Sequence, residues 1–248
     1  TCALPIYVIR MFIGTSSNGE DNPIEAIYEY SLRKNCSQEL DIVWMKQTRD
    51  PTSFWHGFNT QFWPTPFSGY RWAIAEYCNY EGRALYTDCD MINFKDISEL
   101  WNTDMHGKPL AARKGTRFGG HEFCVTLIDC AAFKKVADVP VSRQRTLDNY
   151  HQRCIGHFSG NDDLVHELDA RWNCLDGENY MIEDLWHLHW TNMATQPWRP
   201  GWFTGTPTEH PRADLVTMFE DMLIEANDAG YDGQIAEYPP FNYNIIGR

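Results

Sequence analysis

The chain has 248 residues, of which 43% are hydrophobic and 14% aromatic, so it can bury a large core in one α/β domain. Its formal net charge of −13 argues against a nucleic-acid backbone as the partner, because such binding depends on lysines and arginines that neutralise phosphates. No apolar run approaches the ~18 residues of a membrane-spanning helix, and residues 1–5 show no secretory signal.

The eight cysteines are scattered along the chain and form no CxxC pair. This pattern favours reduced, buried thiols over a disulfide framework or a zinc site, although the even number leaves an oxidised alternative open. We therefore predict a cytoplasmic protein.

Two strands and a helix are predicted at the start of the chain. Residues 6–13 are rich in β-branched and aromatic side chains, and a polar loop follows them. Residues 22–34 predict a helix with Asn22 as its N-cap, and residues 40–45 predict the next strand. Strand, helix and strand in this order form a βαβ unit, which implies parallel strands.

The alternation of strands and helices continues after an aromatic, loop-like segment at residues 50–67. A helix is predicted over residues 68–80 and a buried strand over residues 84–88, which together indicate a doubly wound sheet. In such a sheet, ligands collect beyond the carboxyl ends of the strands. The rest of the chain predicts a single helical turn, three strands and an amphipathic helix, at residues 96–101, 110–112, 123–128, 186–191 and 211–227.

A pair of carboxylates ends the predicted strand at residues 84–88. Asp88 and Asp90 are two positions apart, so in extended chain both point to one face and can reach one hard cation. Two acidic groups held together repel each other unless a metal ion or a proton relieves the repulsion. The pattern indicates a divalent ion and a phosphate-bearing substrate, although a polar turn after a strand can have the same spacing.

Two motifs are specific enough to suggest a family. They are the Asp-Cys-Asp strand end at residues 88–90 and the His-Trp-Thr segment at residues 189–191, followed by Pro-Trp at residues 197–198. Weaker matches, in the same order along the chain, lie at residues 6–14, 82–87, 127–130 and 167–173. The set resembles a bacterial and viral group of glycosyltransferases of the GT-A fold, related to family 8.

The resemblance implies the fold and the division of the chain. We expect an α/β, GT-A (Rossmann-like) domain over residues 1–205, with a mostly parallel central sheet and flanking helices. Residues 206–248 are expected to form a C-terminal helix and a tail packed on the same domain.

The resemblance also implies that Asp88, Asp90 and His189 coordinate Mn²⁺ or Mg²⁺, which binds the diphosphate of a nucleotide-sugar. Carboxylates and imidazole suit Mn²⁺, and the ion can neutralise the charge on the departing nucleoside diphosphate. His187 would share a strand face with His189 and could compete for this role. Relatives usually carry a lysine before the Pro-Trp pair. Residues 192–196 contain none, so the second cation on the diphosphate is left open.

Four further residues are expected to contact the donor. Arg71 lies where the family has an arginine facing the donor, and a planar guanidinium suits a bridge between an aspartate and a donor oxygen. A surface arginine is the alternative. Ile13, Gly14 and Thr15 are expected to line the nucleobase and ribose pocket, with a plain tight turn as the alternative.

Asp162 and Asp163 match, inexactly, an Asp-Gln-Asp motif that the family places beside the reacting sugar. One of them is expected to orient the sugar or to stabilise an oxocarbenium-like centre. The alternative is that both cap a following helix. Flat faces for sugar rings could come from aromatic side chains, although most of these belong to the core. The candidates are Trp55, Trp63, Trp198 and Trp202.

These features predict a metal-dependent glycosyltransferase that moves a sugar from a nucleotide-sugar, with a UDP-sugar as the expected donor, to a hydroxyl acceptor on a glycan or another molecule. The family favours retention of the anomeric configuration. Two other classes stay open. A phosphohydrolase or nucleotidyltransferase would use the same Asp and His cluster without a sugar acceptor, and a non-catalytic carbohydrate-binding protein would bind through its aromatic loops.

Overall fold

The structure, a computed structural model, describes residues 8–115, 119–137, 145–201, 203 and 205–233. Cys2, Trp202 and the expected tail at residues 234–248 lie outside the described residues. The large sheet has the order β2-β1-β3-β6-β5-β7. Its strands are β1 (Ile9–Gly14), β2 (Leu40–Met45), β3 (Arg83–Asp88), β5 (Leu110–Lys114), β6 (His121–Asp129) and β7 (Val165–Leu168).

The large sheet is mixed but mostly parallel. β1 lies between β2 and β3 and runs parallel to both, as the βαβ pattern predicted, and β5 and β7 are also parallel. β6 runs antiparallel to its neighbours β3 and β5. The all-parallel arrangement of a doubly wound sheet therefore does not continue beyond β3. The side chains of β1 are nearly all buried, because helices cover both faces of this central strand.

A second, smaller sheet lies beside the end of β3. It consists of β4 (Met91–Asn93), β9 (His187–His189) and β8 (Cys174–Leu175), in that order. β4 and β9 are antiparallel, with Met91 opposite His189. This pairing brings the chain that follows β3 next to a segment about a hundred positions further along.

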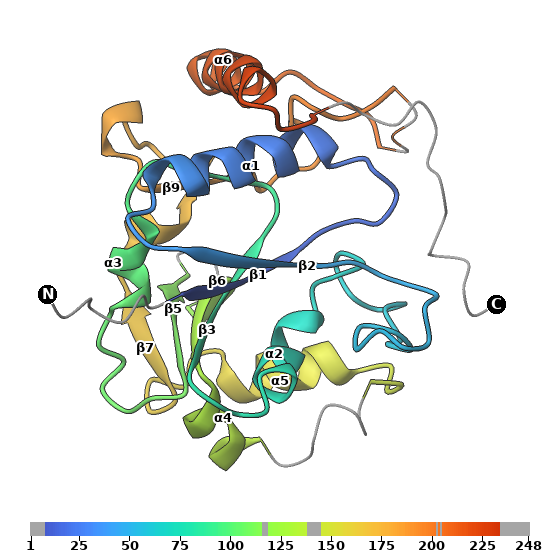
Figure 1. The fold of residues 1–248 in the computed structure, drawn as a ribbon, viewed down its shortest axis with the longest axis vertical. Coiled ribbons are helices and arrows are strands. Elements are labelled where there is room, and N and C mark those ends of the chain that lie inside the picture. Colours follow the sequence, from blue (N-terminus) through green and yellow to red (C-terminus); the bar gives the residue numbers. More distant parts are fainter. Residues whose placement is uncertain (1–7, 116–118, 138–144, 202, 204, 234–248) are drawn as a thin grey trace, which may run out of the picture.

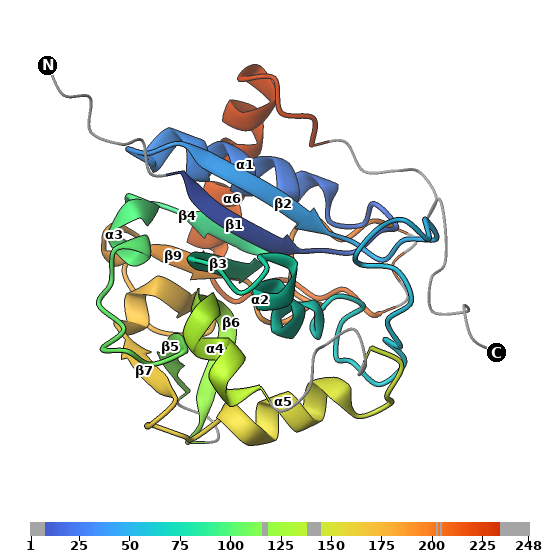
Figure 2. The ribbon, with the colours of Figure 1, turned by 60° about the horizontal axis from the view of Figure 1, so that its bottom comes forward.

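Helices cover both sides of the large sheet (Figure 1). On one side lies α1 (Asn22–Asn35), with α6 (Ala213–Asp228) beyond it. On the other side lie α2 (Ile74–Tyr77), α4 (Cys130–Val136) and α5 (Tyr150–Phe158), and the turned view of Figure 2 shows the same layers. The short elements α3 (Ile97–Trp101), η1 (Tyr70–Ala73), η3 (Ala170–Asn173) and η4 (Ile182–Asp184) lie in the connections. No helix in the described parts of the chain is both long and apolar enough to cross a membrane.

The two long helices match their predictions closely. α1 buries Ile24, Ile27, Tyr28 and Leu32, although its N-cap residue is Asp21 and not Asn22. α6 buries Leu215 and Phe219 against the rest of the domain and contacts α1 through an ion pair between Lys34 and Glu225. The division of the chain at residue 205 stays a prediction.

The helix predicted over residues 68–80 was wrong in its extent. The structure has only the single turns η1 and α2 there. Asn79 and Tyr80 have positive φ values of 54° and 61°, which a right-handed helix does not allow. Gly69 is packed against the ring of Trp63, where a Cβ atom would clash, so the loop before η1 is fixed by packing.

Candidate active site

Asp88 is the last residue of β3, at the carboxyl end of the central strands, where the sequence placed a site. Its carboxylate is buried and accepts hydrogen bonds from Arg71 Nη2, at 3.0 Å, and from the Tyr86 hydroxyl. Both bonds end on Oδ1. The other carboxylate oxygen, Oδ2, is outside these two bonds.

Asp90 and His189 lie side by side, as the resemblance implied. His189 Nε2 is 3.4 Å from Asp90 Oδ1. The pairing of β4 with β9 produces this contact, since Met91 lies opposite His189 and Trp190 N donates to Asp90 O. Burial disfavours charge on both groups. It raises the pKa of Asp90, whereas the adjacent carboxylate raises the pKa of His189 in spite of burial.

The two carboxylates and the imidazole fit a divalent cation. Asp90 Oδ1 is buried and accepts no hydrogen bond from the described residues, which is unusual for a buried carboxylate oxygen. A cation between Asp88, Asp90 and His189 would satisfy this oxygen, and oxygen with imidazole nitrogen is a donor set suited to Mn²⁺. Cys124 on β6 also reaches this point. Ligand atoms of Asp88, Cys124 and His189 all lie within 4.8 Å of one another.

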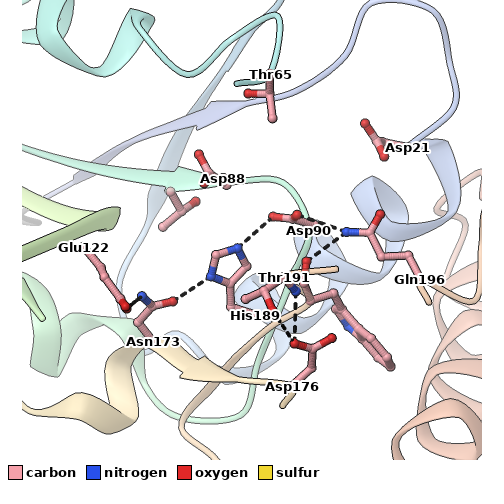
Figure 3. A network of polar contacts seen from close by, with 12 residues as sticks. Asp21, Thr65, Asp88, Asp90, Glu122, Asn173, Asp176, His189, Thr191 and Gln196 are labelled. Carbon is pink, nitrogen blue, oxygen red and sulfur yellow. Dashed lines mark hydrogen bonds and ion pairs between the residues drawn. The ribbon is translucent and has the colours of Figure 1, made fainter. Parts of the chain in front are cut away.

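Asn173 fixes the ring of His189 from the side away from Asp90 (Figure 3). Its Oδ1 lies 2.9 Å from His189 Nδ1, and its Nδ2 faces Glu122 Oε2 at 3.4 Å. Because a carboxylate accepts from the amide nitrogen, the amide oxygen faces the ring, and Nδ1 carries the proton. Nε2 then faces Asp90, and in the neutral ring its lone pair is available to a bound cation.

His187 is not the competing ligand that the sequence left open. Its side chain is fully buried, with Nδ1 3.0 Å from Trp172 O and Nε2 2.9 Å from the Tyr28 hydroxyl. Burial lowers the pKa of His187 to about 3, so it is neutral. Both ring nitrogens are used within the core, and the ring joins β9 to α1.

Gln196, Arg199 and Asp21 extend the polar network on the far side of Asp90. Gln196 Nε2 donates to Asp90 Oδ2 at 3.2 Å, and Arg199 donates to Gln196 Oε1 and, at 3.0 Å, to Asp21 Oδ1. The Arg199 side chain is only 4% exposed. The buried Arg199 guanidinium is thus linked to Asp90 through one side chain, Gln196. It lies close to residues 192–196, which contain no lysine.

Arg71 is buried and not a surface arginine. Nε donates to Ser68 O at 2.7 Å, Nη1 to Phe123 O and Nη2 to Asp88. Burial opposes its charge, but the Asp88 carboxylate raises the pKa of Arg71 above its ordinary value. The contact with Asp88 matches half of the expected bridge, and a donor oxygen would be the other half.

Ile13, Gly14 and Thr15 lie beside Asp88, since Gly14 pairs with Asp88 across β1 and β3. The Ile13 side chain is in the hydrophobic core, and Thr15 Oγ1 donates to Glu25 at 2.6 Å. A Cβ atom on Gly14 would meet Phe67 and the Tyr86 hydroxyl. Packing therefore requires this glycine, and its role in a nucleotide pocket stays a prediction.

Asp162 and Asp163 lie in a turn before β7, so the alternative that they cap a helix was wrong. Asp162 is paired with Lys114 at 3.2 Å and lies 3.6 Å from His121 Nε2. The described contacts of Asp162 and Asp163 include none with Asp88, Asp90 or His189. Their role beside the sugar stays a prediction.

Three of the four candidate tryptophans are core residues. Trp55, Trp63 and Trp198 are each at most 7% exposed. Trp63 packs on Tyr70, and Trp198 stacks on Phe219. These three rings do not offer free faces to a sugar, and Trp202 lies outside the described residues.

Comparisons with known proteins find matches among glycosyltransferases. The family profile described as Glycosyl transferase family 8 matches residues 69–122, which include Arg71, Asp88 and Asp90. Glycosyltransferase GlyA of Streptococcus pneumoniae serotype 4 is 28% identical over 158 residues, which cover 54% of this chain and 23% of GlyA. The chain thus spans less than a quarter of the length of this curated relative.

Two solved structures share the fold. The galactosyltransferase LgtC, in complex with donor and acceptor sugar analogues, superimposes with a TM-score of 0.56 at 13% identity, covering 88% of this chain and 96% of LgtC. The glycosyltransferase GlyE of Streptococcus pneumoniae TIGR4 has a TM-score of 0.56 at 16% identity, covering 90% of this chain and 65% of GlyE. The expected GT-A fold is confirmed.

Proposed function

We propose that this chain, a glycosyltransferase related to family 8, transfers a sugar from a nucleotide-sugar to a hydroxyl acceptor with a divalent cation bound at the end of β3. The single observation that carries the proposal is the meeting of Asp90 and His189, 3.4 Å apart, beside the buried Asp88. Residues so distant in the sequence converge here on one point. The LgtC structure, with its donor and acceptor analogues, supports a sugar acceptor by analogy of fold.

In this proposal Asp88, Asp90 and His189 hold Mn²⁺ or Mg²⁺. The bound ion supplies positive charge to the diphosphate as it leaves. Arg71 holds Asp88 in place through a buried ion pair, and Asn173 keeps the proton of His189 on Nδ1. Gln196 holds the second oxygen of Asp90. These contacts orient all three ligands before the donor binds, which reduces the reorganisation needed during the reaction.

The finer points of the proposal are the donor, the stereochemistry and the cellular compartment. We favour a UDP-sugar and retention of configuration, from the family resemblance, with Arg199, which Gln196 links to Asp90, as a second cation beside Arg71. Asp162 and Asp163 remain proposed sugar contacts. The described cysteines are all free thiols, which supports a reducing, cytoplasmic setting.

A thermal-unfolding panel tests the proposal. UDP, GDP and their sugars are added to the protein with and without Mn²⁺, and the midpoint is recorded. We expect one nucleotide to raise the midpoint only when the metal is present, because a ligand that binds the native state alone stabilises it. The sugar derivative of that nucleotide should then transfer its sugar to an added glycan acceptor.

The matched control is Asp90→Asn, which keeps the shape of the side chain and its bond to Gln196 but removes the charge. It should lose the metal-dependent shift. Absence of any nucleotide shift in the wild-type protein would contradict the proposal. Release of phosphate from the donor without an acceptor would instead favour the phosphohydrolase.

A further inference from the structure

A cysteine faces the carboxylate and the imidazole of the candidate metal site. In the pairing of β3 with β6, Thr87 lies opposite Val125, so Cys124 lies beside Asp88. Ligand atoms of Asp88, Cys124 and His189 lie within 4.8 Å of one another. Cys124 is half-buried.

The surroundings hold these three side chains in place. Arg71 fixes Asp88 and also donates to Phe123 O, the carbonyl immediately before Cys124. Asn173 Oδ1 lies 2.9 Å from Nδ1 of His189, which leaves Nε2 facing the site. One thiol, one carboxylate and one imidazole therefore converge from three strands, β6, β3 and β9.

This donor set differs in chemistry from the expected Asp88, Asp90 and His189. Mn²⁺ and Mg²⁺ prefer oxygen ligands, whereas thiolates select softer ions such as Zn²⁺. Three protein ligands with sulfur among them and one open position are typical of zinc held in tetrahedral geometry. Cobalt(II) occupies such sites as a spectroscopic substitute for zinc.

We propose that Asp88, Cys124 and His189 form a site for a thiophilic divalent cation, Zn²⁺ above all, in which the Cys124 thiolate is a ligand. The site shares Asp88 and His189 with the proposed Mn²⁺ site, so the two ions exclude each other. Zn²⁺ then displaces Mn²⁺ and blocks the site. This inference rests on the metal site of the proposed function and does not depend on which sugar is transferred.

The test is a cobalt titration of the wild-type protein, of Cys124→Ser and of the control Cys36→Ser, whose half-buried thiol lies at the end of α1. Wild type and the control should develop the strong near-ultraviolet absorption of a sulfur-to-cobalt charge transfer, which Zn²⁺ should abolish. Cys124→Ser should lack this band and bind Zn²⁺ at least about tenfold more weakly, a loss typical of metal-site substitutions. Its affinity for Mn²⁺ should change by less than about threefold.

A band that survives in Cys124→Ser, or an equal loss of Zn²⁺ and Mn²⁺ affinity, would overturn the inference. A second measurement on the wild-type protein covers the case in which the variant does not fold. Zn²⁺ should protect one thiol from alkylation, and peptide mapping should identify it as Cys124. Protection of another cysteine, or of none, also overturns the inference. A cobalt–thiolate band without any nucleotide-dependent stabilisation would overturn only the proposed function.

Discussion

Asn173 orients His189 because its Oδ1 accepts a hydrogen bond from Nδ1 over 2.9 Å. The amide nitrogen of Asn173 faces Glu122, and this contact determines which way the amide points. As a consequence, Nε2 of His189 faces Asp90, where it can be a ligand of a metal ion. Asn173 is not a proposed metal ligand, but it fixes the orientation of the His189 ring, which is one.

The first prediction concerns this contact. Asn173→Ala should weaken Mn²⁺ binding by about 10- to 100-fold, the usual loss when the partner of a metal-ligating histidine is removed. Asn173→Asp keeps an acceptor for Nδ1 and should retain most of the affinity. Titration of free Mn²⁺ by electron paramagnetic resonance measures both. Equal, wild-type affinity in the two variants would show that Asn173 does not orient the ring.

The second prediction concerns the buried pair of Arg71 and Asp88. Arg71→Met leaves a buried carboxylate without its cation, so the metal-free protein should lose about 3–5 kcal/mol of unfolding free energy. Arg71→Lys keeps the charge but cannot reproduce all three donor directions of the guanidinium, and it should lose less. Denaturant unfolding measures both losses, and a loss below 1 kcal/mol in Arg71→Met would contradict the buried pair.

The third prediction concerns pH and His151. Burial first, and then the charge of Arg71, lowers the pKa of His151 to about 4, and Trp72 Nε1 donates to its Nδ1 at 3.0 Å. Between the unfolded value of 6.5 and about 4, the unfolded chain binds a proton that the folded chain does not. Stability from this group is therefore full above pH 6.5 and falls by about 1.4 kcal/mol for each pH unit below it.

His151→Gln can still accept from Trp72 but does not titrate. Its unfolding free energy should fall less steeply with acid than that of the wild type, by the same ~1.4 kcal/mol per unit between pH 6.5 and 4. His187 titrates in both proteins and cancels in the difference. Parallel pH profiles for the two proteins would mean that His151 is not held neutral by the fold.

The fourth prediction concerns Gly14. A Cβ atom there would lie 2.7 Å from Phe67 Cδ2 and 2.9 Å from the Tyr86 hydroxyl. Gly14→Ala should therefore destabilise the protein by about 1–3 kcal/mol and, because the Tyr86 hydroxyl bonds to Asp88, weaken metal binding. Gly156→Ala is the matched control, since nothing lies near that position on α5. It should gain about 0.5–1 kcal/mol in denaturant unfolding.

The sequence identified the groups at the centre of the site and placed Arg71 beside an aspartate, but it did not identify Asn173 and Cys124 as partners. Asp88 and Asp90 stand out because charged residues two positions apart end a buried apolar run. His189 followed from the order of motifs. Asn173 and Cys124 are separated from these residues by long stretches of chain, and strand pairing alone brings them together. Hydrophobic periodicity carries no information about that pairing.

The same limit explains the errors in the fold. The long helices α1 and α6 were predicted well because each shows a full apolar face over several turns. The segment at residues 68–80 has helical composition, yet packing of Gly69 on Trp63 and the left-handed residues Asn79 and Tyr80 restrict it to single turns. The strand β8 is two residues long, too short for a periodic signal, whereas the strand predicted at residues 186–191 contains β9.

The candidate centre joins two sheets. Asp88 ends a strand of the six-stranded sheet, whereas His189 belongs to the three-stranded one, about a hundred positions later in the chain. Neither sheet alone supplies all the proposed ligands, so tight binding of a cation shows that the two sheets have packed together. During synthesis, we expect metal affinity to emerge only after β9 has left the ribosome, which makes it a late marker of folding.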